Sequence, residues 1–216
     1  MSTVDRRPST VPAPASAPST SVSAPASGPA PTPSQTVGPF FGHALPLTGG
    51  GDVAPRSAPE TVTLHGRVLD GRGEPVPDAL LEFWQAGPDG RPPAAPGSMR
   101  RDHSTGRDAG RDGVTFTGWG RVPTDADGHY TVRTLRPPAA APYVGVLLFA
   151  RGLLHHLYTR AYLDPAADDA LLASLPGERR ATLVATHEGG EAHRVYRFDL
   201  RIQGDDAQET VFLDFR

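Results

Sequence analysis

The chain contains neither cysteine nor lysine, so all 21 of its basic residues are arginine. The absence of cysteine excludes disulfides, zinc–thiolate sites, iron–sulfur clusters and a cysteine nucleophile. Any metal bound by the chain must therefore be held by His, Tyr, Asp or Glu side chains. A cysteine-free sequence also fits a reducing compartment, and we expect a cytoplasmic protein.

The sequence also has no long apolar run and no excess of positive charge. No stretch of about 18 consecutive apolar residues occurs, and the N-terminus lacks the compact apolar segment of a signal peptide. The formal net charge is −3, and the arginines form no dense basic stripe. We therefore expect neither a membrane nor a nucleic acid among the partners of this chain.

The first part of the chain has a composition typical of disorder. Residues 8–33 consist of Pro, Ser, Thr, Val, Ala and Gly alone. Such a segment has too little hydrophobicity to offset the entropy lost on ordering it. We predict a disordered tail over residues 1–31 and a single folded domain over residues 32–216, long enough to bury an ordinary core.

Short runs of alternating apolar and polar residues follow the tail, separated by turns rich in Gly, Asp and Pro. Seven such runs predict an all-β protein, an antiparallel β-sandwich with one short helix at 166–175 and a long surface loop at 87–113. Trp84 and Trp119 are expected to pack in the core or at an interface. The predicted strands are 61–69, 79–86, 129–135, 143–150, 181–187, 193–202 and 210–215.

Two of the eight histidines, His155 and His156, are adjacent. Neighbouring side chains on a strand point to opposite faces, so this pair cannot easily hold one ion, whereas His-x-His could. Packing or surface imidazoles are the alternative to a metal site. The other six lie in separate segments without the spacing of a local ligand pair, although the fold could still assemble them.

Four stretches together carry a resemblance to a known family. They are "TPSQTVGPFF" (32–41), "EFWQAGPDG" (82–90), "LLFARGLLHHLYTRAYLD" (147–164) and the ending "YRFDLRIQG…ETVFLDF" (196–215). The combination resembles the alpha chains of the intradiol ring-cleavage dioxygenase family, in order and over residues 32–216. The resemblance implies the prealbumin-like sandwich fold of that family.

The resemblance also implies a reaction and a division of labour between two subunits. Intradiol enzymes of this type cleave protocatechuate, a catechol acid, with O2 and a ferric ion held by two tyrosines and a His-x-His pair on the beta subunit. In this chain Pro92 stands where the first tyrosine would be, and "PAAA" (138–141) where the second would be; Tyr143 and Gly145 replace His-x-His. One phenolate cannot retain Fe(III), so we expect no metal here and a hetero-oligomer whose beta subunit binds the iron.

The resemblance places four residues of this chain near the substrate: Thr36, Gly38 and Pro39 of "TVGP", and Arg151 of "FARG". Gly38 would allow the backbone to approach closely, Pro39 would make that wall rigid, and Arg151 would attract the substrate carboxylate. The alternatives are an ordinary turn at "TVGP" and an ion pair between Arg151 and a neighbouring carboxylate.

Two other functions remain open from the sequence. A non-enzymatic prealbumin-like β-sandwich binding module would share the general strand pattern, but it has no need for "TPSQTVGPFF" or "ETVFLDF". A self-sufficient iron enzyme would require ligands that the sequence does not offer at the positions just described. The resemblance favours the non-iron-binding alpha subunit, which would complete the active site of the beta subunit.

Overall fold

The structure of the chain is a computed structural model. Residues 34–216 form one compact unit. The predicted tail at 1–31, together with Thr36 and Pro39, lies outside the described part of the chain. The described residues are Gly38 and the ranges 45–93, 99–106, 108–189, 194–205 and 207–214.

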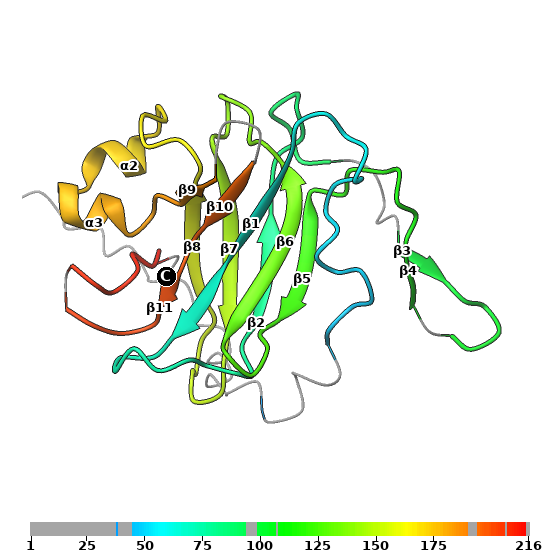
Figure 1. Cartoon of the computed structure of the whole chain (residues 1–216), viewed down its shortest axis with the longest axis horizontal. Coiled ribbons are helices and arrows are strands. Elements are labelled where there is room, and N and C mark those ends of the chain that lie inside the picture. Colours follow the sequence, from blue (N-terminus) through cyan, green and yellow to red (C-terminus); the bar gives the residue numbers. More distant parts are fainter. Residues whose placement is uncertain are drawn as a thin grey trace, which may run out of the picture. The chain divides into compact units, whose positions relative to one another are not determined.

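Two β-sheets make up the body of this unit, together with a separate two-stranded hairpin (Figure 1). In the larger sheet the strands follow the order β11-β1-β10-β9, and β6 also pairs with β1. The bounds of these strands are β1 Thr61–Leu69, β6 His129–Leu135, β9 Thr186–Glu188, β10 Val195–Arg197 and β11 Leu200–Arg201. The smaller sheet has the order β5-β2-β7-β8: β2 Leu80–Trp84, β5 Trp119–Pro123, β7 Tyr143–Phe149 and β8 Leu157–Tyr162. The all-β sandwich prediction is confirmed.

The core lies between the two sheets. Every second residue of β6 and of β7 is buried, which is the period-two pattern of strands with one face inward. Phe83 of β2 and Tyr130 of β6 meet across the sheets with ring centroids 5.4 Å apart. The Tyr130 hydroxyl donates to the carbonyl of Phe198 at 2.6 Å, so this large ring is buried with its polar atom satisfied.

The larger sheet is mixed, because β1 runs parallel to both β10 and β11. The predicted strand at 193–202 is split into these two pieces around Phe198 and Asp199. The Phe198 backbone lies against Gly66 of β1, where a Cβ would stand 1.9 Å from the Phe198 oxygen. Close approach at this glycine keeps both pieces beside β1.

Two other strand predictions were wrong in part. At 181–187, Ala181 ends helix α3 (Gly177–Ala181), and the pairing strand begins only at Thr186. In the stretch predicted at 210–215, the described residues make one isolated bridge, Leu213 to Tyr158, and no ladder. Both stretches alternate in the sequence, but a strand also needs a neighbour along its whole length.

The sequence missed strands β5 and β8 and overestimated one helix. Strand β5 contains Gly120, which has no side chain and so adds nothing to an alternating apolar pattern. The position is nevertheless tightly packed, because a Cβ there would lie 2.6 Å from the Val53 side chain. The predicted helix at 166–175 is reduced to α2 (Ala170–Ser174), because Asp169 caps it and fixes its start. The predicted loop at 87–113 contains a hairpin, β3 (Met99–Arg101) with β4 (Asp108–Arg111).

No helix in the described residues is long and apolar enough to cross a bilayer.

Candidate functional site

A row of aromatic residues crosses three strands at one end of the smaller sheet. Trp84 of β2 pairs with Trp119 of β5 on one side and with Gly145 of β7 on the other. The two indole centroids are 6.0 Å apart and the rings are tilted by 55°. Tyr143 precedes Gly145 by two residues, so both lie on the same face of β7. Trp84 is 50% exposed, so of the two places expected for it, the core or an interface, the core of this chain is excluded.

These residues surround a cavity of about 400 Å³ (the aromatic pocket). The loop after β2 and the turn before β7 supply its other walls. Every position at which the resemblance implied a lost iron ligand is represented in this pocket. The residues concerned are Pro92, Ala141, Tyr143 and Gly145.

The aromatic pocket does not fit a ferric ion. Pro92, Ala141 and Gly145 have no side-chain donor atoms, and the Tyr143 phenol is the one oxygen available at these four positions. In the described part of the chain, no three His, Asp or Glu side chains lie together in an arrangement that could hold a metal. A single monodentate ligand does not retain iron.

An ion pair lies behind the two tryptophans. Arg121 donates to Glu82 Oε1 from Nε at 2.8 Å and from Nη2 at 2.5 Å. Glu82 Oε2 accepts from the Trp84 indole N–H at 3.3 Å, and the Arg121 guanidinium carbon lies 5.2 Å from the Trp119 ring centroid. The Glu82 side chain is only 11% exposed, so the pair holds both indoles in place from the protein side.

A second arginine packs on Trp119. Arg111 donates to the Trp119 carbonyl at 2.6 Å, and its guanidinium carbon is 5.5 Å from the indole centroid. Burial lowers the pKa of Arg111, against the opposing charges of Asp52 and Asp112. The Trp119 indole N–H is buried and has no hydrogen-bond partner within the described residues. Nε and Nη1 of Arg111 are also buried without a partner there, so Arg111 and Trp119 together have three donors that nothing in the described chain satisfies.

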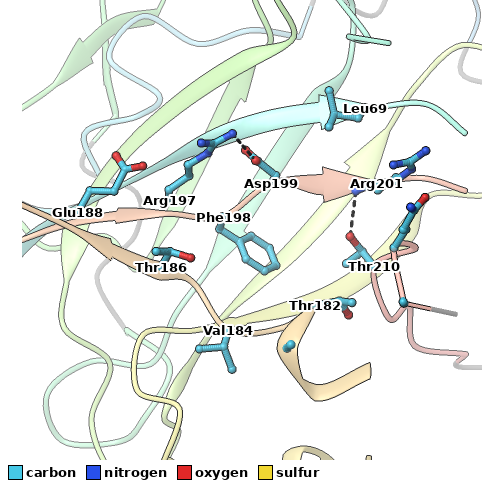
Figure 2. Close-up of a pocket in the computed structure, with 13 residues that line it drawn as sticks. Leu69, Thr182, Val184, Thr186, Glu188, Arg197, Phe198, Asp199, Arg201 and Thr210 are labelled. Atoms are coloured by element: carbon cyan, nitrogen blue, oxygen red, sulfur yellow. Dashed lines mark hydrogen bonds and ion pairs between the residues drawn. The ribbon is translucent and has the colours of Figure 1, made fainter. Parts of the chain in front are cut away.

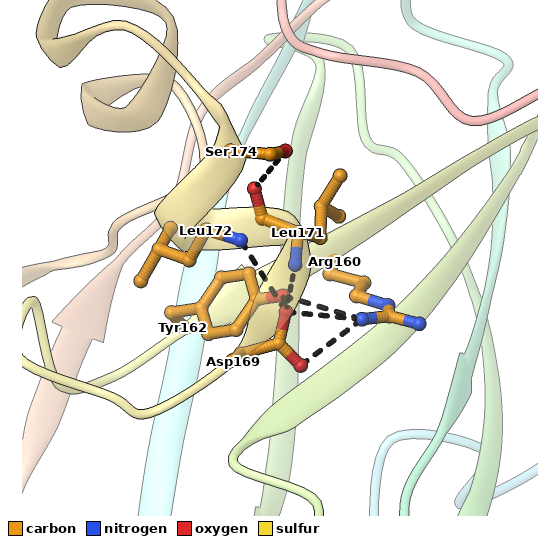
Figure 3. A network of polar contacts seen from close by, with 6 residues as sticks. All are labelled: Arg160, Tyr162, Asp169, Leu171, Leu172 and Ser174. Atoms are coloured by element: carbon orange, nitrogen blue, oxygen red, sulfur yellow. Dashed lines mark hydrogen bonds and ion pairs between the residues drawn. The ribbon is translucent and has the colours of Figure 1, made fainter.

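The strand next to Tyr143 carries a polar network (Figure 3). The Arg160 guanidinium carbon lies 3.9 Å from the centroid of the Tyr143 ring and covers one of its faces. Arg160 also donates to the Asp169 carboxylate at 3.2 and 3.3 Å, and the Tyr162 hydroxyl donates to Asp169 at 2.8 Å. Asp169 in turn accepts from the backbone N–H of Leu171 at 2.9 Å and thereby caps the start of helix α2.

This network shifts two protonation equilibria. Burial raises the pKa of Tyr162 to about 12, with a further contribution from Asp169 and an opposing one from Arg160. Burial alone would lower the pKa of Arg160, but Tyr162, Tyr143 and Asp169 raise it above its ordinary value. Arg160 therefore stays charged and Tyr162 stays neutral across the physiological pH range.

The substrate residues expected from the resemblance are only partly described. Thr36 and Pro39 lie outside the described residues. Gly38 has φ of 80°, a left-handed conformation that favours glycine, and nothing lies within 4 Å of the place of a Cβ. Arg151 follows β7 in a turn, its side chain is 63% exposed, and its Nε pairs with Asp78. The ion pair considered as an alternative for Arg151 is thus present.

The adjacent histidines lie just before β8. His155 is exposed, whereas His156 is partly buried, bonds the Tyr158 hydroxyl and packs on Phe149 with ring centroids 5.3 Å apart. Both line a cavity of about 480 Å³ that also includes Phe212. His156 thus packs on aromatic residues, both histidines border a cavity together with the C-terminal segment, and neither lines the aromatic pocket.

The structure brings together two histidines that the sequence left apart. His65 of β1 and His129 of β6 lie with Nδ1 and Nε2 3.2 Å apart, and His65 Nε2 contacts Glu188 of β9 at 2.9 Å. His129 is 64 positions from His65 in the chain and Glu188 is 123 positions from it, so no local spacing could have revealed these contacts. Glu188 also borders a cavity of about 560 Å³ that extends along β10 and β11 (Figure 2).

Comparison with known proteins gives consistent matches. The family model described as Dioxygenase matches residues 38–147. The chain is 42% identical to the protocatechuate 3,4-dioxygenase alpha chain of Burkholderia cepacia over 84% of its own length and 95% of that protein's. It is 31% identical to the beta chain of that species, over 68% of this chain and 66% of the other. Among solved structures, the dioxygenase domain of a dioxygenase and carbohydrate-binding fusion from Streptomyces sp. SirexAA-E is similar in fold, with a TM-score of 0.50, 24% identity and coverage of 84% of this chain and 100% of that one.

Proposed function

The chain belongs to the intradiol ring-cleavage dioxygenase family, and from this premise we propose that it is the alpha subunit of a protocatechuate 3,4-dioxygenase. In this proposal the chain binds no iron and completes the active site of a beta subunit that holds Fe(III). The assembled enzyme cleaves protocatechuate with O2 to 3-carboxy-cis,cis-muconate. It works in the cytoplasm as a hetero-oligomer.

The observation that carries the proposal is the composition of the aromatic pocket. An intradiol enzyme that worked alone would need several oxygen and nitrogen ligands around its iron, as the resemblance implies. Here proline, alanine and glycine occupy three of the positions, and an arginine covers the ring of the fourth, Tyr143. Family membership combined with this lack of donors supports a subunit that depends on another chain for its metal.

Similarity to both alpha and beta chains supports the proposed partner. Two homologous sandwiches can associate as a pseudo-symmetric pair, in which equivalent surfaces of the two subunits face each other. The exposed apolar side chains of Trp84 and Leu154, 50% and 61% accessible, are available for such a contact. Leu154 follows Arg151, a proposed substrate residue, by three positions in the segment after β7.

Arg151 is proposed to bind the substrate carboxylate, together with the backbone of Thr36, Gly38 and Pro39. Its ion pair with Asp78 engages Nε, and a guanidinium has four further N–H donors. The high exposure of the side chain leaves it accessible to a ligand held by another subunit. Asp78 would then orient Arg151 for this contact.

Co-expression with a beta chain tests the subunit assignment. The purified alpha chain alone should be colourless and inactive, because ferric–tyrosinate absorption needs phenolates that it lacks. The two chains together should co-purify and cleave protocatechuate with iron in proportion to the beta chain. Stoichiometric iron and visible colour in the alpha chain alone would contradict the proposal, as would full activity of the beta chain without it.

Steady-state kinetics of the assembled enzyme test the role of Arg151. Arg151→Ala should raise KM for protocatechuate by about 5–150-fold, the equivalent of about 1–3 kcal/mol for a charge-assisted hydrogen bond. Catechol, which lacks the carboxylate, should be affected much less. Arg194→Ala removes another exposed arginine paired with a carboxylate, Glu60, and serves as the control. Equal losses on both substrates would show that Arg151 does not recognise the carboxylate.

A further inference from the structure

The cluster of His65, His129 and Glu188 lies outside the aromatic pocket and has no part in the proposed function. His65 is on the central strand β1, His129 begins the neighbouring strand β6, and Glu188 ends strand β9. Their side chains surround a cavity of about 250 Å³ on the larger sheet. The His65 side chain is 22% exposed and that of Glu188 is 41% exposed, so small solutes can reach them.

The contact with Glu188 fixes how His65 presents its nitrogens. An ionised carboxylate only accepts hydrogen bonds, so Nε2 of His65 must carry a proton in the 2.9 Å contact. In the neutral ring, Nδ1 then keeps its lone pair, and this atom faces His129 Nε2 at 3.2 Å. A carboxylate on the far nitrogen of a histidine is the arrangement that orients imidazole ligands in metal sites.

The separation of the two imidazole nitrogens also fits a shared ion. With metal–nitrogen bonds of about 2.0–2.1 Å, two nitrogens 3.2 Å apart subtend about 100–106° at the metal, near the tetrahedral angle of about 109°. The ring centroids are 5.4 Å apart and the planes are inclined by 52°, so the rings are not stacked on each other. Only the proton between the two nitrogens would have to leave.

Two arginines, Arg67 and Arg197, border this cavity, and one of them is paired with a carboxylate. Arg197 pairs with Asp199 at 2.7 Å, as Figure 2 shows beside Glu188. Asp199 also accepts from the backbone N–H of Arg67 at 2.9 Å. The guanidinium of Arg197 is thus matched by a carboxylate in the same cavity, whereas the side chain of Arg67, which also borders the cavity, is exposed.

We propose that His65 and His129 form a two-histidine site for a divalent transition metal such as Zn²⁺ or Cu²⁺, with Glu188 orienting His65 through its Nε2. Two protein ligands and water complete the coordination, because Glu188 contacts the far nitrogen of His65 and is not itself a ligand. Imidazole nitrogens suit these metals and not Mg²⁺. The bound ion would connect β1 to β6 and stabilise the folded chain through linkage.

Titration of the co-purified subunit complex with Zn²⁺ tests the site, with Mg²⁺ as a negative control ion. The wild-type complex should bind one Zn²⁺ more per alpha chain than complexes with His65→Gln or His129→Gln. Glu188→Gln should weaken binding by about 10–100-fold, since it removes the charge that orients His65. At about ten times the dissociation constant, Zn²⁺ should raise Tm by about 3–6 °C, and neither histidine variant should show this rise.

His187→Gln is the matched control, because His187 is on the same strand as Glu188 and packs on Tyr196 with centroids 5.0 Å apart. It should retain the full Zn²⁺ stoichiometry. Electron paramagnetic resonance of added Cu²⁺ should show coupling to two imidazole nitrogens in the wild type and to fewer in His65→Gln. Equal Zn²⁺ binding in wild type and both histidine variants, or a dissociation constant above the millimolar range, would overturn the proposal and leave the subunit assignment untouched.

Discussion

The two sheets of this chain distribute potential ligand atoms in opposite ways. At the end of the smaller sheet, Trp84, Trp119 and Tyr143 border a pocket in which three of the four positions that the resemblance assigns to iron ligands have no side-chain donor. On the larger sheet, His65 and His129 place two imidazole nitrogens 3.2 Å apart. The fold determines where side chains converge, and the residues at those points determine the chemistry.

Two glycines, Gly66 of the larger sheet and Gly145 of the smaller one, differ in how closely other atoms pack against them. Gly66 in β1 would place a Cβ 1.9 Å from the Phe198 carbonyl oxygen, a contact with backbone that no side-chain rotation relieves. Gly145 in β7 would place its Cβ 3.4 Å from the Trp84 oxygen, which is ordinary van der Waals contact. One glycine is required by packing, whereas the other stands where the resemblance implied a lost ligand and has room for a side chain.

A pair of alanine substitutions tests this difference and should show the largest effect. We expect Gly66→Ala to lower the free energy of unfolding by more than about 3 kcal/mol, because β1 and the Phe198 backbone must separate. Gly145→Ala should change it by less than about 1 kcal/mol. Urea unfolding of each variant measures both values. Similar losses in the two variants would contradict the structural distinction between these two glycines.

The ion pair behind the aromatic pocket should give the next largest effect. Glu82→Ala leaves the Arg121 guanidinium without its carboxylate and Trp84 without its acceptor. We expect a loss of about 3 kcal/mol in the free energy of unfolding, since breaking a largely buried pair leaves an uncompensated charge. Glu82→Gln keeps an acceptor and should lose less. A loss no greater than that of an exposed residue would show that solvent replaces the contact.

Asp169 should matter less, because its contacts with Arg160, at 3.2 and 3.3 Å, are longer than those between Arg121 and Glu82. Asp169→Ala removes the cap of α2 and the partner of Arg160 and Tyr162. We expect the free energy of unfolding to fall by about 1–2 kcal/mol, mainly through the lost cap. Asp168→Ala changes the preceding, exposed residue and is the matched control. Thermal unfolding that does not separate these two variants would contradict the role given to Asp169.

The sequence predicted what depends on local pattern. The bounds of β1 and β6 agree with the prediction at both ends, because alternation and turn residues define them without reference to distant partners. The stretch at 210–215 alternates as well, yet its described residues make a single bridge. Whether a stretch forms a strand depends on neighbours that are distant in the sequence, so the alternating pattern at 210–215 could not show by itself that this stretch forms no ladder.

The candidate sites show the same limit. The positions of the aromatic pocket followed from the resemblance, since family motifs mark Pro92, Tyr143 and Gly145 in the chain. The contact of His65 with His129 depends on the register between β1 and β6, in which Arg67 is the direct partner of His129 and His65 lies diagonally across. Register is a property of the assembled sheet, and single-sequence patterns do not specify it.

Tyr162 provides the smallest and most specific test, through the alkaline limit of stability. Its pKa is raised to about 12, mainly by burial, whereas a tyrosine in the unfolded chain titrates near about 10. The unfolded state therefore loses this proton first as pH rises. The contribution of the protonated phenol to stability is complete below about pH 10 and is lost between about pH 10 and 12.

Tyr162→Phe should remove this part of the pH dependence, because phenylalanine has no proton to lose. Both proteins should still weaken at high pH, since burial also raises the pKa of Tyr130 well above its usual value. The urea midpoint of the variant should consequently fall less steeply than that of the wild type between pH 10 and about 12. The offset between the two curves below about pH 9 measures the lost hydrogen bond to Asp169. Parallel curves throughout would mean that the Tyr162 phenol titrates in the folded chain as it does in the unfolded one.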